Sequence, residues 1–233
     1  MKALIIALVA VATAFPAVAA TASQDAPAAK AGVSAPAPAA KDDKAAAEPN
    51  MGPPVSIDGF RSAQFGATEQ DLMPVIAKDL GVSDKQIRVE NNPVERTRAL
   101  ITSSETVLPD SGPATVAYIL GATSKRLMQV NVVWTVSAKD KAAMERLANT
   151  ANTLRDFFLH KGTYVKKTLA ANAKLPDDSV LVFRGGDEKG RLIVLHLIVH
   201  PPAANNDGDA TLVLSYIEKP DAPDVFKLGP SAF

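Results

Sequence analysis

The stretch from 127 to 158, LMQVNVVWTVSAKDKAAMERLANTANTLRDFF, contains two different hydrophobic periodicities. In its first ten residues Val130, Val132 and Trp134 alternate with more polar residues such as Asn131, which is typical of a strand with one buried face. After that, apolar residues recur every three or four positions, as on one face of a helix: Ala143, Met144, Leu147, Ala151, Leu154 and Phe158. The stretch therefore predicts a strand followed by a long helix.

Helix-boundary signals support this helix and predict a second one. Ser137 and Asp140 have the spacing of a capping pair before the long helix, and Gly162 follows its last residues. An earlier helix has Thr68 as its predicted cap and Gly81 just beyond its end. Its apolar positions are Leu72, Val75, Ile76 and Leu80, and Pro74 predicts a kink or a later start.

Strand-like runs follow each helix and are separated by turns rich in Gly, Pro, Asp and Ser. We therefore predict an α+β fold of two helix-strand-strand-strand units, residues 56–136 and 137–220, that form antiparallel sheet with the helices packed on one face. The sequences of the two halves do not align, so a coincidence of element types is the alternative to a repeat. The predicted strands are Thr97–Leu108, Ala114–Leu120, Leu127–Val136, Val180–Arg184, Arg191–Val199 and Ala210–Glu218.

The strand at Arg191–Val199 differs from the others because both of its faces are apolar. Ile193 and Leu195 point one way, and Leu192 and Val194 point the other. A helix can cover one face, so the second face requires the other half of the chain, a second copy or a partner.

The N-terminal composition predicts an exported protein. An apolar run of about a dozen residues ends before Pro16, and the residues 17–19 match a signal-peptidase site. A membrane anchor is the alternative, but a spanning helix needs about 20 apolar residues. We predict a signal peptide at 1–19, a disordered Ala/Pro-rich linker at 20–55, and an α+β domain at 56–233 with a short C-terminal tail. The expected location is the periplasm, with no membrane span after cleavage.

Composition excludes several kinds of chemistry and partner. The chain has no cysteine, which removes disulfides, iron–sulfur clusters, thiolate zinc sites and cysteine nucleophiles. Its 25 basic residues are balanced by 25 acidic residues, so nucleic acid is a poor candidate partner. The densest basic patch consists of Lys161, Lys166 and Lys167 beside His160, and a solvated helix end explains it.

Metal and catalytic motifs are also not found. His196 and His200 have the spacing of two helical zinc ligands, but on a strand four residues separate them by roughly 13 Å. Nucleophile-elbow, S-x-x-K and H-E-x-x-H motifs are absent from the sequence. The run Gly121–Lys125 is similar to a phosphate loop but lacks its second glycine, which favours a hairpin turn. The aspartates Asp177, Asp178, Asp207 and Asp209 are typical of turns, with weak calcium binding as the alternative.

We therefore expect no catalytic, cofactor or metal-binding residues and no enzyme. The expected function is a protein-binding or envelope-assembly module whose partner is a second copy or an envelope protein. The alternative is a small-ligand carrier or enzyme whose site is assembled from Glu90, Arg96, Arg98, His196 and Tyr216. The first three belong to the polar cluster 90–98, which is either a recognition loop or a solvated connection.

Three runs resemble uncharacterised exported proteins of Gram-negative bacteria, alphaproteobacteria in particular: Gly59–Thr68, Gly112–Gly121 and Leu127–Trp134. The resemblance covers most of 57–199 and implies no activity. In shape, the segment from Phe65 to Gly81 is similar to outer-membrane assembly lipoproteins of the BamE type and to tandem-repeat β-lactamase inhibitor proteins. The chain departs from both in lacking the lipobox cysteine and disulfides. This likeness implies a helix packed on an antiparallel sheet that binds protein.

Overall fold

The computed structural model describes residues 52–105, 107–202 and 207–227. The predicted signal peptide and residues 20–51 of the predicted linker lie outside the described residues. The last linker residues are described: Val55 is buried, and Pro54 forms a parallel bridge with Thr163.

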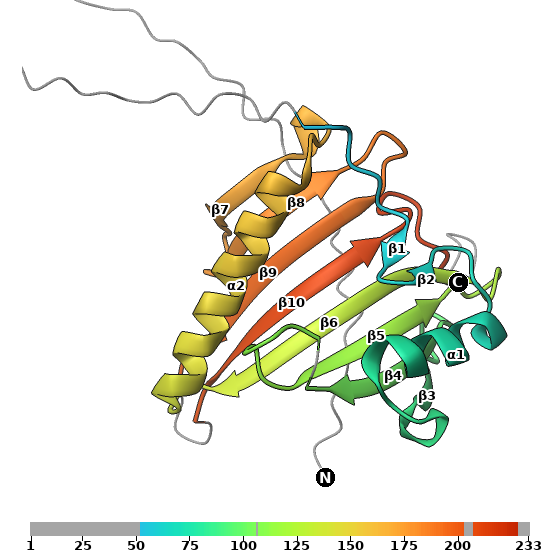
Figure 1. The fold of residues 1–233 in the computed structure, drawn as a ribbon, viewed down its shortest axis with the longest axis horizontal. Coiled ribbons are helices and arrows are strands. Elements are labelled where there is room, and N and C mark those ends of the chain that lie inside the picture. The colour runs from blue at the N-terminus through green and yellow to red at the C-terminus, as the bar shows by residue number, and fades with distance from the viewer. Residues whose placement is uncertain (1–51, 106, 203–206, 228–233) are drawn as a thin grey trace, which may run out of the picture. The chain divides into compact units, whose positions relative to one another are not determined.

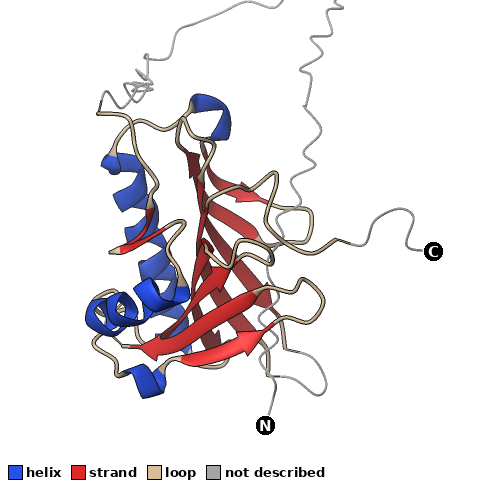
Figure 2. Ribbon diagram, turned by 90° about the vertical axis from the view of Figure 1, so that its right-hand side faces the viewer, coloured by secondary structure: helices blue, strands red, loops and turns tan. Residues whose placement is uncertain are grey.

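Eight strands form one antiparallel sheet in the order β3-β4-β5-β6-β10-β9-β8-β7 (Figure 1). Both helices lie on the same face of this sheet (Figure 2). The prediction of an α+β fold with helices packed on antiparallel sheet is therefore confirmed. The strands are β3 Arg88–Asn91, β4 Arg98–Ser104, β5 Ala114–Leu120, β6 Leu127–Ser137, β7 Ala170–Lys174, β8 Val180–Gly186, β9 Leu192–His200 and β10 Asp209–Ile217.

The centre of the sheet is the pairing of β6 with β10, which joins the strands that follow the first helix to those that follow the second. Val132 lies opposite Leu214, and Trp134 lies opposite Leu212. All four are buried in the main core. The indole of Trp134 donates to the Ser111 hydroxyl at 3.1 Å, so its polar edge is satisfied inside the core.

Helix α1, Glu69–Leu80, has the predicted boundaries. Thr68 accepts a hydrogen bond from the Asp71 backbone, and the Asp71 carboxylate accepts one from the Thr68 backbone. Gly81 ends the helix with φ of 65°, a left-handed conformation that favours glycine. Pro74 lies inside the helix, so the alternative of a later start is wrong.

Helix α2, Lys141–Lys161, is capped by Asp140, whose carboxylate accepts from the Ala143 backbone at 3.0 Å. The prediction that Ser137 opens the helix is wrong. Ser137 is the last residue of β6, where it pairs with Asp209, and this pairing holds it in the sheet.

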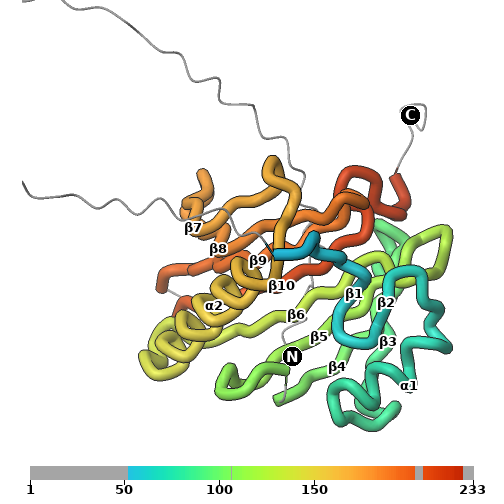
Figure 3. The backbone as a smooth tube through the Cα atoms, turned by 45° about the horizontal axis from the view of Figure 1, so that its top comes forward, coloured from blue at the N-terminus to red at the C-terminus, as the bar shows by residue number. Residues whose placement is uncertain are grey.

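A small hairpin, β1 Gly59–Phe60 and β2 Ala63–Gln64, lies on the helical face (Figures 1 and 3). The Phe60 ring packs against Tyr118 and Tyr216, with ring centroids 6.5 and 5.5 Å apart. Burial raises the pKa of both tyrosine hydroxyls. The hairpin thus covers the central strands beside the helices.

Each helix is followed by four strands, one more than expected. The additional strands, β3 and β7, lie at the two edges of the sheet. All four residues of β3 are exposed. In β7, Asn172 has φ of 53° and falls between the paired residues Ala171 and Ala173. Such edges lack the buried face that produces an alternating pattern, and their short or irregular form limits pairing with another chain. A separate difference is the length of β4, which ends at Ser104 and not at the predicted Leu108.

The start of β9 is buried on both faces, as predicted, but its second face packs against residues of its own half of the chain, which was not among the expected covers. Ile193 and Leu195 belong to the main core beneath the helices. Leu192 and Val194 pack with Ile217 in a second cluster. Among the described residues, no helix is long and apolar enough to cross a membrane.

Candidate functional site

An open groove of about 860 Å³ lies where three segments meet. The first turns of α1, the β3–β4 loop (residues 92–97) and the β5–β6 turn (residues 121–126) line it. Its volume falls within the range of small-molecule sites.

The lining is strongly basic. Its cations are Arg96, Arg98, Lys125 and Arg126, and Glu69 is the one carboxylate among the described lining residues. Both carboxylate oxygens of Glu69 pair with the Arg98 guanidinium: Oε2 lies 2.7 Å from Nε, and Oε1 lies 2.9 Å from Nη2. Four cations against one carboxylate leave three positive charges in excess.

Arg126 is held by a backbone carbonyl, because its Nη1 donates to Gly66 O at 2.8 Å. Asp71 lies close enough for the Arg126 charge to act on it. Hydrogen bonds from Thr68 are the main cause that lowers the Asp71 pKa, and Arg126 adds to them. Arg126 is thus only partly compensated and still contributes positive charge to the groove.

The β3–β4 loop is shaped by Asn92. Its side-chain oxygen accepts from the backbones of Val94 and Glu95, at 3.0 and 3.1 Å, and its backbone donates to Thr97 O. Arg96 then adopts φ of 54°. The loop therefore has a defined turn geometry that projects from the end of β3.

The β5–β6 turn is held by Asp224, which lies about a hundred residues away in sequence. Its carboxylate accepts from the Thr123 and Ser124 backbones at 3.0 and 2.8 Å. Burial opposes ionisation, but these hydrogen bonds outweigh it and lower the Asp224 pKa to about 2. A Cβ at Gly121 would lie 2.1 Å from the Asp224 carboxylate, so any other residue there requires this carboxylate to move. The predicted hairpin turn is confirmed, and its backbone binds an internal carboxylate.

The same C-terminal segment also reaches the β3–β4 loop. The Phe226 backbone donates to Glu95 O at 2.9 Å. The Arg96 guanidinium lies 3.6 Å from the centroid of the Phe226 ring, a cation–π contact. Residues 224–226 therefore tie together two of the three segments that line the groove.

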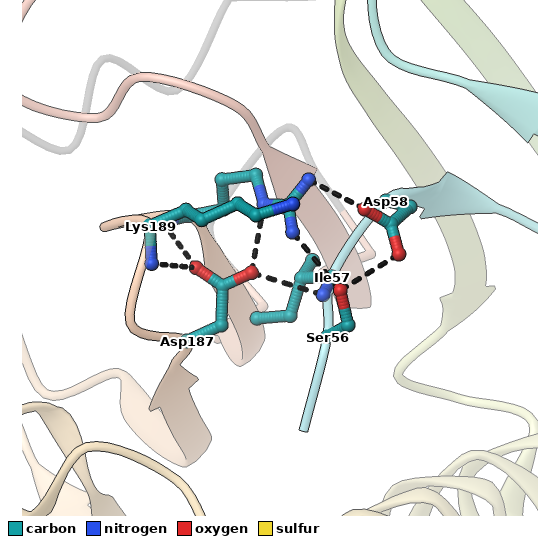
Figure 4. Close-up of polar contacts among 6 residues, drawn as sticks. Ser56, Ile57, Asp58, Asp187 and Lys189 are labelled. Carbon is teal, nitrogen blue, oxygen red and sulfur yellow. Dashed lines mark hydrogen bonds and ion pairs between the residues drawn. The ribbon is translucent and has the colours of Figure 1, made fainter. Parts of the chain in front are cut away.

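A second polar network centres on Arg191 and shares no residue with the groove lining. Figure 4 shows its members Ser56, Asp58 and Asp187. Asp187 accepts from the backbones of Ile57 and Lys189 at 3.0 Å and from Arg191 Nε at 2.7 Å, and Arg191 also pairs with Asp58 at 2.7 Å. Burial alone would raise the Asp187 pKa, but the hydrogen bonds and the guanidinium together lower it. This network attaches the start of the domain to the β8–β9 turn.

The residues of the alternative scattered site do not come together. Arg96 and Arg98 line the groove, but Glu90 pairs with Arg88 at 2.9 Å on an edge strand. His196 lies opposite Val213, while Tyr216 faces Phe60 beneath the helices. Because neighbouring positions on β9 and β10 alternate between faces, His196 and Tyr216 lie on opposite faces of the sheet. The prediction that these five residues could form one site is wrong.

His196 takes part in a different contact. Its Nε2 lies 2.7 Å from Ser179 Oγ, which in turn lies 2.5 Å from Asp177 Oδ1. In a nucleophilic triad the carboxylate accepts a hydrogen bond from the histidine, whereas here it accepts one from the serine. Ser179 is also 3% exposed. The arrangement is that of a turn closing the β7–β8 hairpin, as predicted for Asp177.

The other candidate metal ligands are separated. His200 pairs with Asp209 at 2.8 Å, and Asp207 pairs with Lys139 at 2.6 Å. Asp178 pairs with Lys174. Within the described part of the chain, no three His, Cys, Asp or Glu residues gather as a metal site would require.

Comparisons with protein-family models, with curated proteins and with solved structures found no match to this chain. Function is therefore inferred from the groove. Arg96 and Arg98 belong to the possible recognition loop at 90–98, and Lys125 ends the run that is similar to a phosphate loop. Glu69 and Arg126 were not predicted, because nothing in their local sequence distinguishes them from ordinary surface charges.

Proposed function

We propose that this protein is a binding module that takes an acidic segment of another protein into the groove between α1, the β3–β4 loop and the β5–β6 turn. The observation that carries this proposal is the excess of three positive charges among the groove-lining residues. An acidic polypeptide supplies carboxylates that complement this charge, and Arg forks pair well with them.

Rigidity supports the proposal. The Arg98–Glu69 pair, the Asn92 turn and the Asp224 contacts hold the three segments in place, so little ordering is needed when a ligand binds. Each exposed ion pair contributes only about 0.2–1 kcal/mol, and three of them predict weak, salt-dependent binding.

We place this binding function outside the cytoplasm. The signal-like residues 1–19 motivate an exported, periplasmic protein, and the absence of cysteine is compatible with any compartment. A role in envelope assembly, for a partner that is a second copy or an envelope protein, is part of the same proposal. It is a proposal of binding without catalysis.

We also propose that the two halves of the domain arose from one helix-and-sheet unit. In support, α1 precedes β3–β6, α2 precedes β7–β10, and the last strands of the two halves pair at the centre of the sheet.

The test is titration of the protein with fluorescent peptides of Glu, Lys or uncharged Gly/Ser residues, followed by anisotropy at low and high salt. We expect the Glu peptide to bind best and to weaken as salt rises. Lys125→Glu should reduce its affinity by about three- to tenfold, since it replaces an attractive pair with a repulsive one. Lys141→Glu, at the exposed start of α2, is the matched control and should change nothing.

Two results would overturn the proposal. One is a Glu peptide that binds no better than the uncharged peptide. The other is an equal effect of Lys125→Glu and Lys141→Glu, which would mean that net charge alone governs binding.

A further inference from the structure

Two exposed apolar side chains and three exposed lysines occur between residues 157 and 169, in the last turns of α2 and just beyond them. Phe157 is 55% exposed and Leu169 is 44% exposed. Lys161, Lys166 and Lys167 are exposed beside them in sequence. We call these five residues the basic end.

The exposure of Phe157 follows from the helix. Phe158 is buried and stacks on Phe183 with centroids 5.2 Å apart. Phe157, one position earlier, is rotated about 100° away from the sheet. Its one described cationic neighbour is Lys161, whose Nζ lies 5.9 Å from the ring centroid. The side chain therefore projects from the surface next to a positive charge.

The three lysines are not compensated by carboxylates. None of them forms an ion pair among the described residues. The nearest acidic residue along α2, Asp156, pairs with Arg155 at 2.8 Å. At the β8–β9 turn, exposed Glu188 is balanced by the adjacent Lys189. The basic end thus keeps an excess of positive charge.

A short segment joins the two parts of the basic end, and a backbone hydrogen bond fixes it to the sheet. Lys161 ends α2, and Lys166 begins the short η2 helix, Lys166–Thr168, at most about 17 Å further along the chain. The Val165 backbone donates to Gly186 O, which fixes η2 against β8. Figures 1 and 2 place the end of α2, η2 and the first described residues at one end of the molecule.

We propose that the basic end docks on an anionic lipid surface. The lysines would lie among the headgroup phosphates, and Phe157 and Leu169 would enter the boundary between headgroups and acyl chains. A membrane is favoured over a protein because single apolar side chains project next to lysines, which is the arrangement that interfacial segments use. The basic end shares no residue with the groove lining. Gly52 accepts a hydrogen bond from Thr163 here, so the preceding sequence joins the domain at the docking end.

This inference does not rest on the acidic-segment groove. The test is co-sedimentation of residues 20–233, the predicted mature chain, with vesicles of phosphatidylcholine alone and of phosphatidylcholine mixed with phosphatidylglycerol. We expect binding to the anionic vesicles only, weakening as salt rises. Each lysine contributes about fivefold to such binding. The Lys166→Glu/Lys167→Glu variant should therefore lower it more than tenfold.

Further variants separate the contributions. Phe157→Ala should lower binding several-fold and leave its salt dependence unchanged, because it removes apolar contact only. Lys141→Glu, at the opposite end of α2, should bind as the unmodified protein does. Lys125→Glu should weaken binding of the Glu peptide and leave vesicle binding intact, so failure of this inference and failure of the groove are distinguishable.

Three outcomes would overturn the inference. The first is no binding to the anionic vesicles, and the second is equal binding to both kinds of vesicle. The third is binding of the Glu peptide that depends on Lys166 and Lys167 while the vesicles do not bind, which would make the basic end a protein interface.

Discussion

Replacing Arg191 with Met removes the guanidinium that joins the start of the domain to the β8–β9 turn. The Arg191 side chain is 11% exposed and that of Asp187 is 2% exposed. Removing one partner of a buried ion pair costs about 3–5 kcal/mol, because the other charge loses its compensation. Asp187 keeps its backbone donors from Ile57 and Lys189, so we expect the lower end, about 3 kcal/mol.

For a domain of this size, that loss corresponds to a fall in Tm of about 6–12 °C. Urea unfolding followed by the fluorescence of Trp134, the one tryptophan of the chain, measures the free energy of unfolding. The control is Arg88→Met, which breaks an exposed pair with Glu90 and should cost about 0–1 kcal/mol. Equal losses of stability in both variants would show that the Arg191–Asp187 pair stabilises the protein no more than an exposed pair does.

The difference between the unmodified protein and Arg191→Met should also depend on pH. The folded-state pKa of Asp187 is lowered, so its stabilising effect is present above the unfolded-state pKa near 3.8 and is lost as pH falls below it. Protonation removes the charge that Arg191 balances. The unfolding curves of the two proteins should therefore differ at neutral pH and converge as the pH falls well below 3.8.

Asp224→Asn should destabilise the protein at neutral pH and have a smaller effect near pH 2. The pKa of Asp224 is lowered to about 2 in the folded state, so the stability that its charge contributes is lost as the pH falls from 3.8 towards 2. Thermal unfolding at the two pH values tests this. Gly121→Ala should loosen the C-terminal segment, because the added Cβ displaces Asp224, and faster proteolysis between 218 and 227 would report it. Unchanged proteolysis would contradict that account. Leu72→Ala should cost about 2–5 kcal/mol in urea unfolding, since Leu72 is fully buried on the inner face of α1. A loss below 1 kcal/mol would contradict its placement in the core.

Elements governed by neighbours in sequence were predictable. The capping box of Thr68 and Asp71, the glycine at 81 and the bounds of β5 follow from contacts within a few residues. Ser137 was misassigned because its pairing with Asp209 on β10, far along the chain, keeps it in the sheet.

Edge strands were missed for a related reason. β3 and β7 have no continuous buried face, so they show no period-two pattern, and their strand conformation depends on the neighbours β4 and β8. With these two strands the large sheet has eight strands, whereas six were predicted.

The groove could be predicted only in part. Residues 90–98 were recognised as a possible recognition loop by their polarity alone. Glu69 and Arg98 lie 29 positions apart, and Asp224 lies 101 positions from Thr123. No local pattern relates residues at such separations.

The fold class, the two helices with most of their ends, and the two apolar faces of β9 can be read from the sequence, because hydrophobic periodicity and capping act over a few residues. That the two groups of strands form a single sheet through β6 and β10 was visible only in the structure. The tertiary structure also decided that His196 and Tyr216 face opposite ways and that four cations meet in one groove. These features depend on strand register and on packing between segments that are distant in sequence. Local propensity does not determine such contacts, because they form only when long loops close.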